Sequence, residues 1–566
     1  KEFFMHDLLI KNGTIIDGTG GDRFHGDISV TDGLITGVGN QLGQAKRVVD
    51  ADGLLVTPGF IDVHTHYDGQ VTWDPYLTPS TYHGVTTAIF GNCGVGFAPV
   101  KKANVSYLIN LMEGVEDIPG SVLSEGVRFN WESFPEYLDI LDSSPKAIDI
   151  GAQVPHAPLR LYVMGERGAD HAENPSQEEI DLMGSLLEES LNAGALGFTT
   201  SRTTKHLSRD GKNTPSLSAK DDELRGLALA MKRAGRGIIE VNSDFGPGEF
   251  EIMRMASEVS GRPLSILLLQ TNNSPSLWRK TRDQIKSARA RGLAVNGQVG
   301  CRPIVVIMGL ETTINPFSTH PKWKQLLSLS KEDRLIRIKG DSDLRHDLIH
   351  QLPDDEHTRQ IKQWLPKTFL MHKGFDYEPL PESNICTIAK DRGISPFEVA
   401  LEGMLANDGN GLLAHTFENY FDGDLEVIKE MLLDEGTIMG LGDGGAHVCT
   451  VCDEGAPTYL LSHWGRDRKR GDTIPLEFLI KKHTSVSAHG YGLLDRGLIK
   501  VGYKADINVI NYEKLSLLDA EIVYDLPAGG RRLIQRAKGY QHTFVSGSEI
   551  ISHDNQTGNL PGRLLR

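Results

Sequence analysis

The chain has 566 residues, of which 39% are hydrophobic and 24% are charged, and its formal net charge is −16. This is the composition of an ordinary globular protein that is too long for one small core. The negative charge argues against a protein that binds nucleic acid or an anionic membrane, because both partners require a basic surface.

The cysteines and the apolar segments indicate the compartment. The five cysteines are odd in number and scattered, which is not a disulfide framework, and this favours a reducing compartment such as the cytoplasm. Cys449 and Cys452 form a single C-x-x-C pair, and without a second pair we interpret this spacing as incidental. No apolar run approaches the ~20 residues of a membrane span, so we expect no membrane partner.

The two ends of the chain share one pattern. Between residues 5 and 57, short apolar runs alternate with Asn-Gly, Asp-Gly and Gly-Gly turns, which is typical of hairpins. Similar runs return at 497–510 and 541–547. We therefore predict a small β-sandwich domain built from both ends, residues 1–57 and 491–566.

The middle, residues 58–490, alternates strand-like and helix-like segments. Ser176 to Glu179 is a capping box that opens one helix, and further helices are predicted over 221–234, 249–260 and 279–291. Alternation over this length implies a parallel sheet, and an α/β fold of the (β/α)₈ TIM-barrel type is the commonest solution. The Pro- and charge-rich stretch 312–385 is predicted to be an insertion.

The sequence TPGFIDVHTHY contains two histidines directly after the first predicted barrel strand. In an extended chain His64 and His66 project to the same face, so they can share one metal ion. Asp443 ends a late strand in LGDGGAH, where it can bind the metal and act as general base and acid. Cys93 follows the second strand, and its thiolate is a strong zinc ligand.

Together, GFIDVHTHYDGQ, HGVTTAIFGNCGVGFAPV, MEGVEDIP and the late strand before Asp443 resemble the amidohydrolase superfamily, and more narrowly the N-acyl-D-amino-acid deacylases (D-aminoacylases). The resemblance covers nearly the whole chain. It implies a TIM barrel, hydrolysis of a C–N amide bond, and zinc. By position it implies metal ligation by His64, His66 and Cys93, and a ligand and general-base role for Asp443.

Two family ligands are not matched. This family normally places histidines at the ends of the fifth and sixth strands, whereas IIEVNSDF presents Asn242 and SILLLQTN presents Leu268 and Gln270. We therefore expect one zinc ion, with another divalent metal as the alternative. Asn242, Glu240 or Glu113 could contribute further oxygen ligands to the metal.

Other residues are candidates for holding the substrate. Arg160 presents a fork that suits a carboxylate, and His156 lies beside it in VPHAPLR, although a structural hydrogen-bonding role is an equal alternative. Arg202 follows a predicted strand, where it could bind an anion, and Asn242 is the fourth candidate. Lys205 could be a carboxylated bridging lysine as in hydantoinases, but it lies past the strand end. Two histidines could line the pocket: His415 and His447.

The sequence thus predicts a metal-dependent amidohydrolase that cleaves the amide bond of an N-acyl amino acid. The alternatives are a cyclic-amide or dipeptide hydrolase of the same superfamily, and a barrel that has lost its metal and its catalysis. A small-molecule amide is the expected partner, and homo-oligomerisation stays open.

Overall fold

Short parallel strands at the centre of the chain form a closed barrel. The structure is a computed structural model that describes residues 5–566. The barrel strands are β6 (Phe60–Asp62), β7 (Val85–Phe90), β8 (Asp149–Ala152), β9 (Val154–Pro155), β10 (Gly197–Arg202), β11 (Ile238–Ser243), β12 (Leu264–Leu267), β13 (Val295–Val299) and β17 (Thr437–Met439). They pair as a three-stranded sheet, β6-β7-β8, and a six-stranded sheet, β17-β13-β12-β11-β10-β9.

Two junctions turn these sheets into one barrel. β8 leads into β9 across a single residue, Gln153, so the two segments act as the third barrel strand. On the other side the backbone N–H of Asp443, just after β17, donates to the carbonyl of His64, just after β6, at 3.0 Å. The predicted TIM barrel is confirmed.

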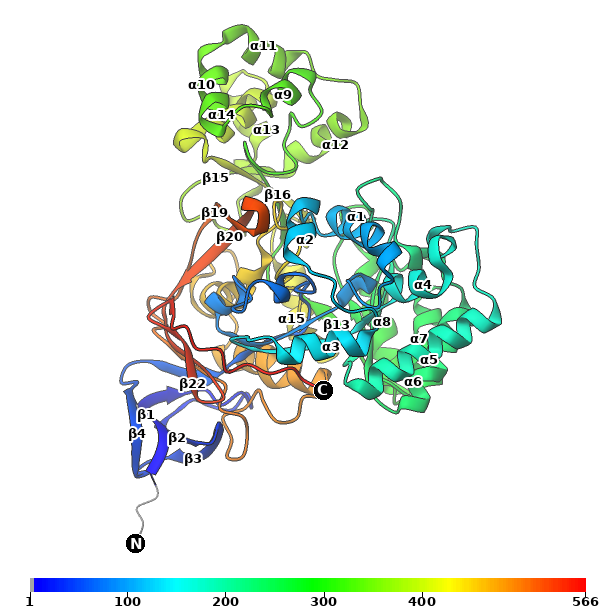
Figure 1. Cartoon of the computed structure of the whole chain (residues 1–566). Helices are drawn as coiled ribbons and strands as arrows, with labels where there is room; N and C mark the ends of the chain where they lie inside the picture. Colours follow the sequence, from blue (N-terminus) through cyan, green and yellow to red (C-terminus); the bar gives the residue numbers. More distant parts are fainter. Residues whose placement is uncertain (1–4) are drawn as a thin grey trace.

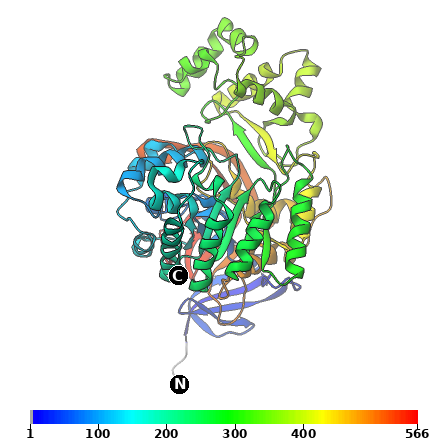
Figure 2. The same ribbon diagram turned by 90° about the vertical axis from the view of Figure 1, so that its right-hand side faces the viewer.

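Amphipathic helices cover the outside of the barrel (Figures 1 and 2). Ser176 caps α5 (Gln177–Ala193) through the predicted capping box, and Ile180, Met183 and Leu187 on one face are buried. The helices that follow are α6 (Asp221–Ala234), α7 (Glu249–Ser260) and α8 (Leu277–Ala290). The remaining barrel helices are α1 (Val105–Val115), α2 (Gly120–Gly126), α3 (Phe134–Ser143), α4 (His156–Met164), α15 (Glu426–Leu433), α16 (Ala456–Tyr459), α17 (Leu476–Lys481) and α18 (Ser487–Gly490).

Strands from both ends of the chain form one sheet beside the barrel, as expected for the β-sandwich domain. The N-terminal strands are β1 (Met5–Ile15), β2 (Phe24–Thr31), β3 (Leu34–Gly39), β4 (Gln44–Asp50) and β5 (Leu55–Pro58). The C-terminal strands are β18 (Ile507–Ile510), β21 (Tyr540–Val545), β22 (Ser548–Ser552) and β23 (Asn555–Gln556). β5 pairs antiparallel with β18, and this contact joins the two halves. The first four residues of the predicted 1–57 portion lie outside the described residues.

A separate lobe follows β13 and stands beyond the carboxyl ends of the strands (Figure 1). Its sheet is β14 (Ile304–Met308), β16 (Leu412–Glu418) and β15 (Thr368–Met371), all antiparallel. Its helices are α9 (Pro321–Leu326), α10 (Lys331–Gly340), α11 (Ser342–His350), α12 (Glu356–Trp364), α13 (Ile385–Arg392) and α14 (Pro396–Gly409). The lobe has its own apolar core. Its elements, from β14 to β16, span a longer segment than the predicted insertion 312–385.

A long hairpin links the sheet domain to the lobe. β19 (Ser516–Leu526) pairs antiparallel with β20 (Gly530–Lys538) and runs along the barrel in Figure 1. At its tip the N–H of Ala528 donates to the carboxylate of Glu125 on α2, at 2.9 Å. The sequence analysis did not predict this hairpin.

Candidate metal centre

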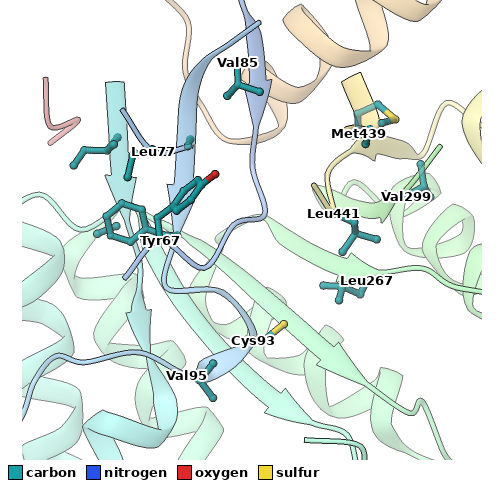
Figure 3. Close-up of a cluster of buried hydrophobic side chains, with 14 of the residues drawn as sticks. Tyr67, Leu77, Val85, Cys93, Val95, Leu267, Val299, Met439 and Leu441 are labelled. Atoms are coloured by element: carbon teal, nitrogen blue, oxygen red, sulfur yellow. The ribbon is translucent and has the colours of Figure 1, made fainter. Parts of the chain in front are cut away.

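Three side chains with metal-binding atoms meet at the carboxyl end of the barrel. The ligand atoms of His64, His66 and Cys93 all lie within 4.8 Å of one another, and all three residues are buried. The two histidines follow β6, and Cys93 follows β7 in a tight turn with a backbone φ of 54°. The thiol of Cys93 points into the barrel interior, toward the side where Leu267 and Leu441 lie (Figure 3).

The turn that carries Cys93 requires glycine. A Cβ on Gly94, whose φ is +66°, would lie 2.6 Å from the backbone nitrogen of Ser201 on β10. Any other residue would therefore push the turn away from the barrel wall. The glycine-rich sequence around Cys93 thus allows its backbone to pack closely against the next barrel strands.

Asp443 completes the group from the last barrel strand. Its Oδ1 lies 3.5 Å from Nε2 of His64 and 3.8 Å from Nε2 of His66. Asp443 has a positive φ of 49°, in a region that is costly for a residue with a side chain. The backbone hydrogen bond from Asp443 to His64 holds this conformation.

These distances fit a tetrahedral metal ion. Ligands placed 2.0–2.3 Å from zinc are separated from one another by roughly 3.3–3.7 Å. Sγ of Cys93 lies 3.4 Å from Nε2 of His64, and the Asp443 distances are similar. The donor set therefore fits a divalent cation such as zinc.

A second layer of side chains orients the ligands. Nδ1–H of His64 donates to Oε1 of Gln298 on β13 at 2.8 Å, which leaves Nε2 free to bind a metal. Oε1 of Glu116 lies 3.2 Å from Nδ1 of His66, within ion-pair distance but without hydrogen-bond geometry. The backbone N–H of Cys93 donates to Glu240 on β11 at 2.9 Å.

The electrostatics of the centre favour a cation. Burial raises the pKa of Glu240 to about 8 and that of Asp62 to about 7, and it raises the pKa values of Asp443, Glu116 and the Cys93 thiol well above their usual range. Within residues 5–566, the ion-pair partners of these carboxylates are histidines and not lysine or arginine. Burial also lowers the pKa of His64 to about 4, so its imidazole is neutral. A bound divalent ion would supply the missing positive charge.

Asn242 and His206 lie beside the candidate metal centre, near the carboxyl ends of β11 and β10. The amide Nδ2 of Asn242 lies 3.5 Å from Sγ of Cys93 and 3.3 Å from Nε2 of His206. Nδ1 of His206 in turn contacts Oγ of Ser201 at 2.9 Å. Burial lowers the pKa of His206 to about 3, which keeps the ring neutral and able to accept from Asn242. Asn242 thus contacts the sulfur of Cys93, the predicted thiolate ligand.

The other predicted substrate residues have structural partners. Nε of Arg160 and Nε2 of His156 both lie 3.0 Å from the Glu223 carboxylate, and all three side chains are fully buried. Arg160 also donates to three backbone carbonyls, those of Gly168, Glu173 and Pro215. These contacts favour the structural alternative for His156 and Arg160, because the buried guanidinium is committed to these acceptors. The substrate-binding role stays a prediction.

Arg202 is engaged in the same way. Its guanidinium donates to both carboxylate oxygens of Glu249 on α7 and to the carbonyl of Ala219. Lys205 pairs with Glu418 of the lobe, and Glu113 pairs with Arg209 at 3.0 Å. These contacts give Arg202 and Glu113 structural partners, and the roles predicted for them stay untested.

The structure also identifies residues that the sequence analysis passed over. Glu116 lies in the MEGVED run, three residues after the Glu113 that was considered. The Glu116 carboxylate is buried, whereas that of Glu113 is partly exposed. Gln298 and Asn296 are two buried polar side chains in the short strand β13, a signal that could have identified Gln298. His447 was predicted to line the pocket, and its Nε2 lies 3.9 Å from Glu116. His415 lies in the lobe, where its ring stacks on Trp364.

Comparison with known proteins agrees with this geometry. Residues 47–551 match the family described as the amidohydrolase family. The chain belongs to the amidohydrolase family. It is 26% identical to a D-aminoacylase of Alcaligenes xylosoxydans xylosoxydans, over 99% of this chain and 97% of that protein.

Two solved structures show the same amidohydrolase fold. An N-acyl-D-glutamate deacylase from Bordetella bronchiseptica, complexed with zinc and a phosphonate mimic of the tetrahedral intermediate, has a TM-score of 0.66 and 22% identity, with 100% of both chains covered. A D-aminoacylase studied for its binuclear metal centre, described by one-metal activation and second-metal attenuation, has the same TM-score and identity, over 99% of this chain and 100% of that one.

Proposed function

We propose that this amidohydrolase uses one divalent metal ion, zinc in the first instance, to hydrolyse the amide bond of an N-acyl amino acid. The observation that carries the proposal is the convergence of His64, His66, Cys93 and Asp443 at the barrel mouth. The relatives named as D-aminoacylase and as N-acyl-D-glutamate deacylase support the substrate class.

A single ion is supported by the residues of the fifth and sixth barrel strands. Asn242 stands on β11 where the family places a histidine, and its amide contacts Cys93 and His206. After β12, the Gln270 amide donates to Asp422 at 2.8 Å, and its oxygen accepts from Phe421 N–H. Neither position offers an imidazole that would bind a second metal ion tightly.

When bound, a divalent cation supplies Lewis acidity that polarises the amide carbonyl and makes water nucleophilic near neutral pH. The chain supplies the proton transfers. Asp443 takes a proton from the attacking water on one carboxylate oxygen and returns it to the nitrogen of the departing amine. Its neighbours His64 and His66 are neutral and cannot replace it as an acid.

Cyclic-amide hydrolysis by a carboxylated lysine is less well supported. Lys205 lies beyond the end of β10 and its ammonium pairs with Glu418. A non-catalytic barrel is also less well supported, because the candidate ligands and their partners Gln298 and Glu116 are all present.

Because all five cysteines are free thiols, we infer a reducing compartment such as the cytoplasm. Among residues 5–566 no helix combines the length and apolarity needed to cross a bilayer.

The test is hydrolysis of a panel of N-acyl-D- and N-acyl-L-amino acids by the zinc-loaded protein, with the released amine measured. We expect turnover of at least one member, and loss of turnover in His66→Ala but not in His489→Ala, which removes an exposed histidine. No turnover of any member with added zinc, cobalt or manganese would refute the proposal.

A further inference from the structure

A cavity lies beside the metal centre, between the carboxyl ends of β11 and β12 and helix α8. Its volume is about 220 Å³, and Asn242 forms part of its wall. The Asn242 amide also lies 3.5 Å from Sγ of Cys93, so a single side chain separates the cavity from the candidate metal ligands.

The wall of the β11–β12 cavity has an apolar part and a part made of uncharged polar side chains, among them Thr271, Asn273 and Ser274. The apolar members are Phe245, Leu267, Leu268, Leu269, Leu277 and Trp278. The two charged members are already paired: Lys205 with Glu418, and Asp244 with Thr203 and Thr204. An uncharged, apolar ligand therefore fits this space better than an ionic one.

The position of Asp443 decides which half of the substrate faces the cavity. Asp443 follows β17, whose barrel neighbours are β13 and β6, whereas Asn242 belongs to β11, between β10 and β12. The two residues therefore stand on opposite walls of the barrel mouth. Since Asp443 protonates the departing amine, the amino-acid half lies on its side and the acyl half extends toward Asn242.

We propose that the β11–β12 cavity is the acyl-chain subsite of this enzyme and selects apolar acyl groups longer than acetyl. The inference rests on the proposed amidohydrolase function and adds the acyl half of its substrate. A cavity of roughly 150 Å³ lined by aliphatic side chains already holds a molecule as large as benzene. The β11–β12 cavity is larger, and is thus sufficient for an unbranched chain of several carbon atoms or an aromatic ring.

Calorimetric binding of carboxylates, the acyl products of the reaction, tests the subsite without relying on turnover. The zinc-loaded protein is titrated with acetate, butanoate and hexanoate. Burial of each methylene group should strengthen binding about three- to fourfold, so we expect hexanoate to bind about a hundredfold more tightly than acetate. Equal binding of acetate and hexanoate would overturn the subsite.

Variants then locate the binding. Leu269→Trp fills the cavity from a partly exposed position, and Thr271→Phe does so independently should the first variant fold poorly. Each should reduce the preference for hexanoate to tenfold or less. Leu494→Trp, at an exposed position at the opposite end of the barrel, should leave it unchanged. A preference that survives both filling variants would contradict the assignment of the cavity.

Rates separate this inference from the proposed function. The kcat/KM for an N-hexanoyl amino acid should exceed that for its N-acetyl counterpart in the wild-type protein, and Leu269→Trp should reverse the order. If no N-acyl amino acid is hydrolysed, the proposed function fails, whatever the carboxylates do. If N-acetyl substrates are hydrolysed but chain length affects neither binding nor rate, only the acyl subsite fails.

Discussion

The sulfur of Cys93 lies 3.4 Å from Nε2 of His64, although 29 residues separate them in the chain. The contact joins the first two barrel strands at their carboxyl ends, where a TIM barrel assembles its catalytic groups. With His66 and Asp443 it forms a set of candidate ligands that lacks a lysine or arginine counter-ion within residues 5–566.

Replacing the proposed base should stop turnover. Asp443→Asn keeps the shape of the side chain but removes its capacity to accept the water proton, so we expect kcat to fall by about 10²–10⁴-fold. Steady-state kinetics on the best N-acyl substrate would measure this, with circular dichroism to verify the fold. Asp472→Asn, at a carboxylate that is 86% exposed, is the matched control and should retain full activity. A fall of less than tenfold in Asp443→Asn would assign the base elsewhere.

Glu116 should tune metal affinity through His66. Because Glu116 lies 3.2 Å from Nδ1 of His66, Glu116→Gln removes the carboxylate that orients the ring, and we expect zinc to bind about 10–100-fold more weakly. Competition with a chromophoric chelator measures the affinity directly.

Glu113→Gln, in the last turn of α1 just before Glu116, provides the comparison, since Glu113 pairs with Arg209 on the outside. It should leave zinc affinity unchanged. Equal zinc affinity in Glu116→Gln and the wild-type protein would mean that His66 is positioned by other contacts.

Arg160 should affect stability and not substrate binding. Arg160→Met leaves the buried Glu223 with His156 alone, so we expect about 3–5 kcal/mol of destabilisation with an unchanged KM. Chemical denaturation measures the free energy of unfolding. Arg167→Met, at a half-exposed arginine, should cost less than about 1 kcal/mol. A stable Arg160→Met protein with a raised KM would restore the substrate-binding role.

The attachment of the lobe should be sensitive to acid. Glu378, in the lobe segment after β15, accepts from the Arg468 guanidinium at 3.0 and 3.1 Å and lies 3.3 Å from His463. These partners lower the pKa of Glu378 to about 2 from the ordinary 4.5, despite the opposing effect of burial. A depressed carboxyl pKa stabilises the fold above the ordinary value, and this stabilisation is lost as the pH falls from about 4.5 toward 2.

We therefore expect Glu378→Gln to lose about 1–3 kcal/mol at pH 7 and to show a smaller further loss between pH 4.5 and 2 than the wild-type protein. Unfolding curves at several pH values measure both effects. Identical pH dependence in the two proteins would show that Glu378 is not the titrating group.

The sequence predicted the barrel and its first helices because their periodicity is local. The capping box at Ser176 and the apolar face of α5 need no tertiary information. The extent of the lobe was not predictable, because β14 and β16 pair across more than a hundred residues and only the pairing reveals them as one sheet.

The same distinction applies to the centre. His64 and His66 are neighbours in an extended segment, so their shared face could be predicted, whereas Gln298 reaches His64 from a strand 234 residues away. Arg160 shows the opposite case. A guanidinium after a barrel strand looked suited to a substrate, and only its burial against Glu223 favours a structural role. The ligand roles of His64, His66, Cys93 and Asp443 stay predictions that metal analysis must test.

The most direct test of the account is the zinc content of the full chain after equilibrium dialysis, measured by mass spectrometry of the metal. The account predicts about one zinc per chain in the wild-type protein and less than a tenth of that when His64 and Cys93 are both replaced by alanine. A wild-type protein that retains no divalent metal, or a double variant that retains it fully, would contradict the proposed metal centre.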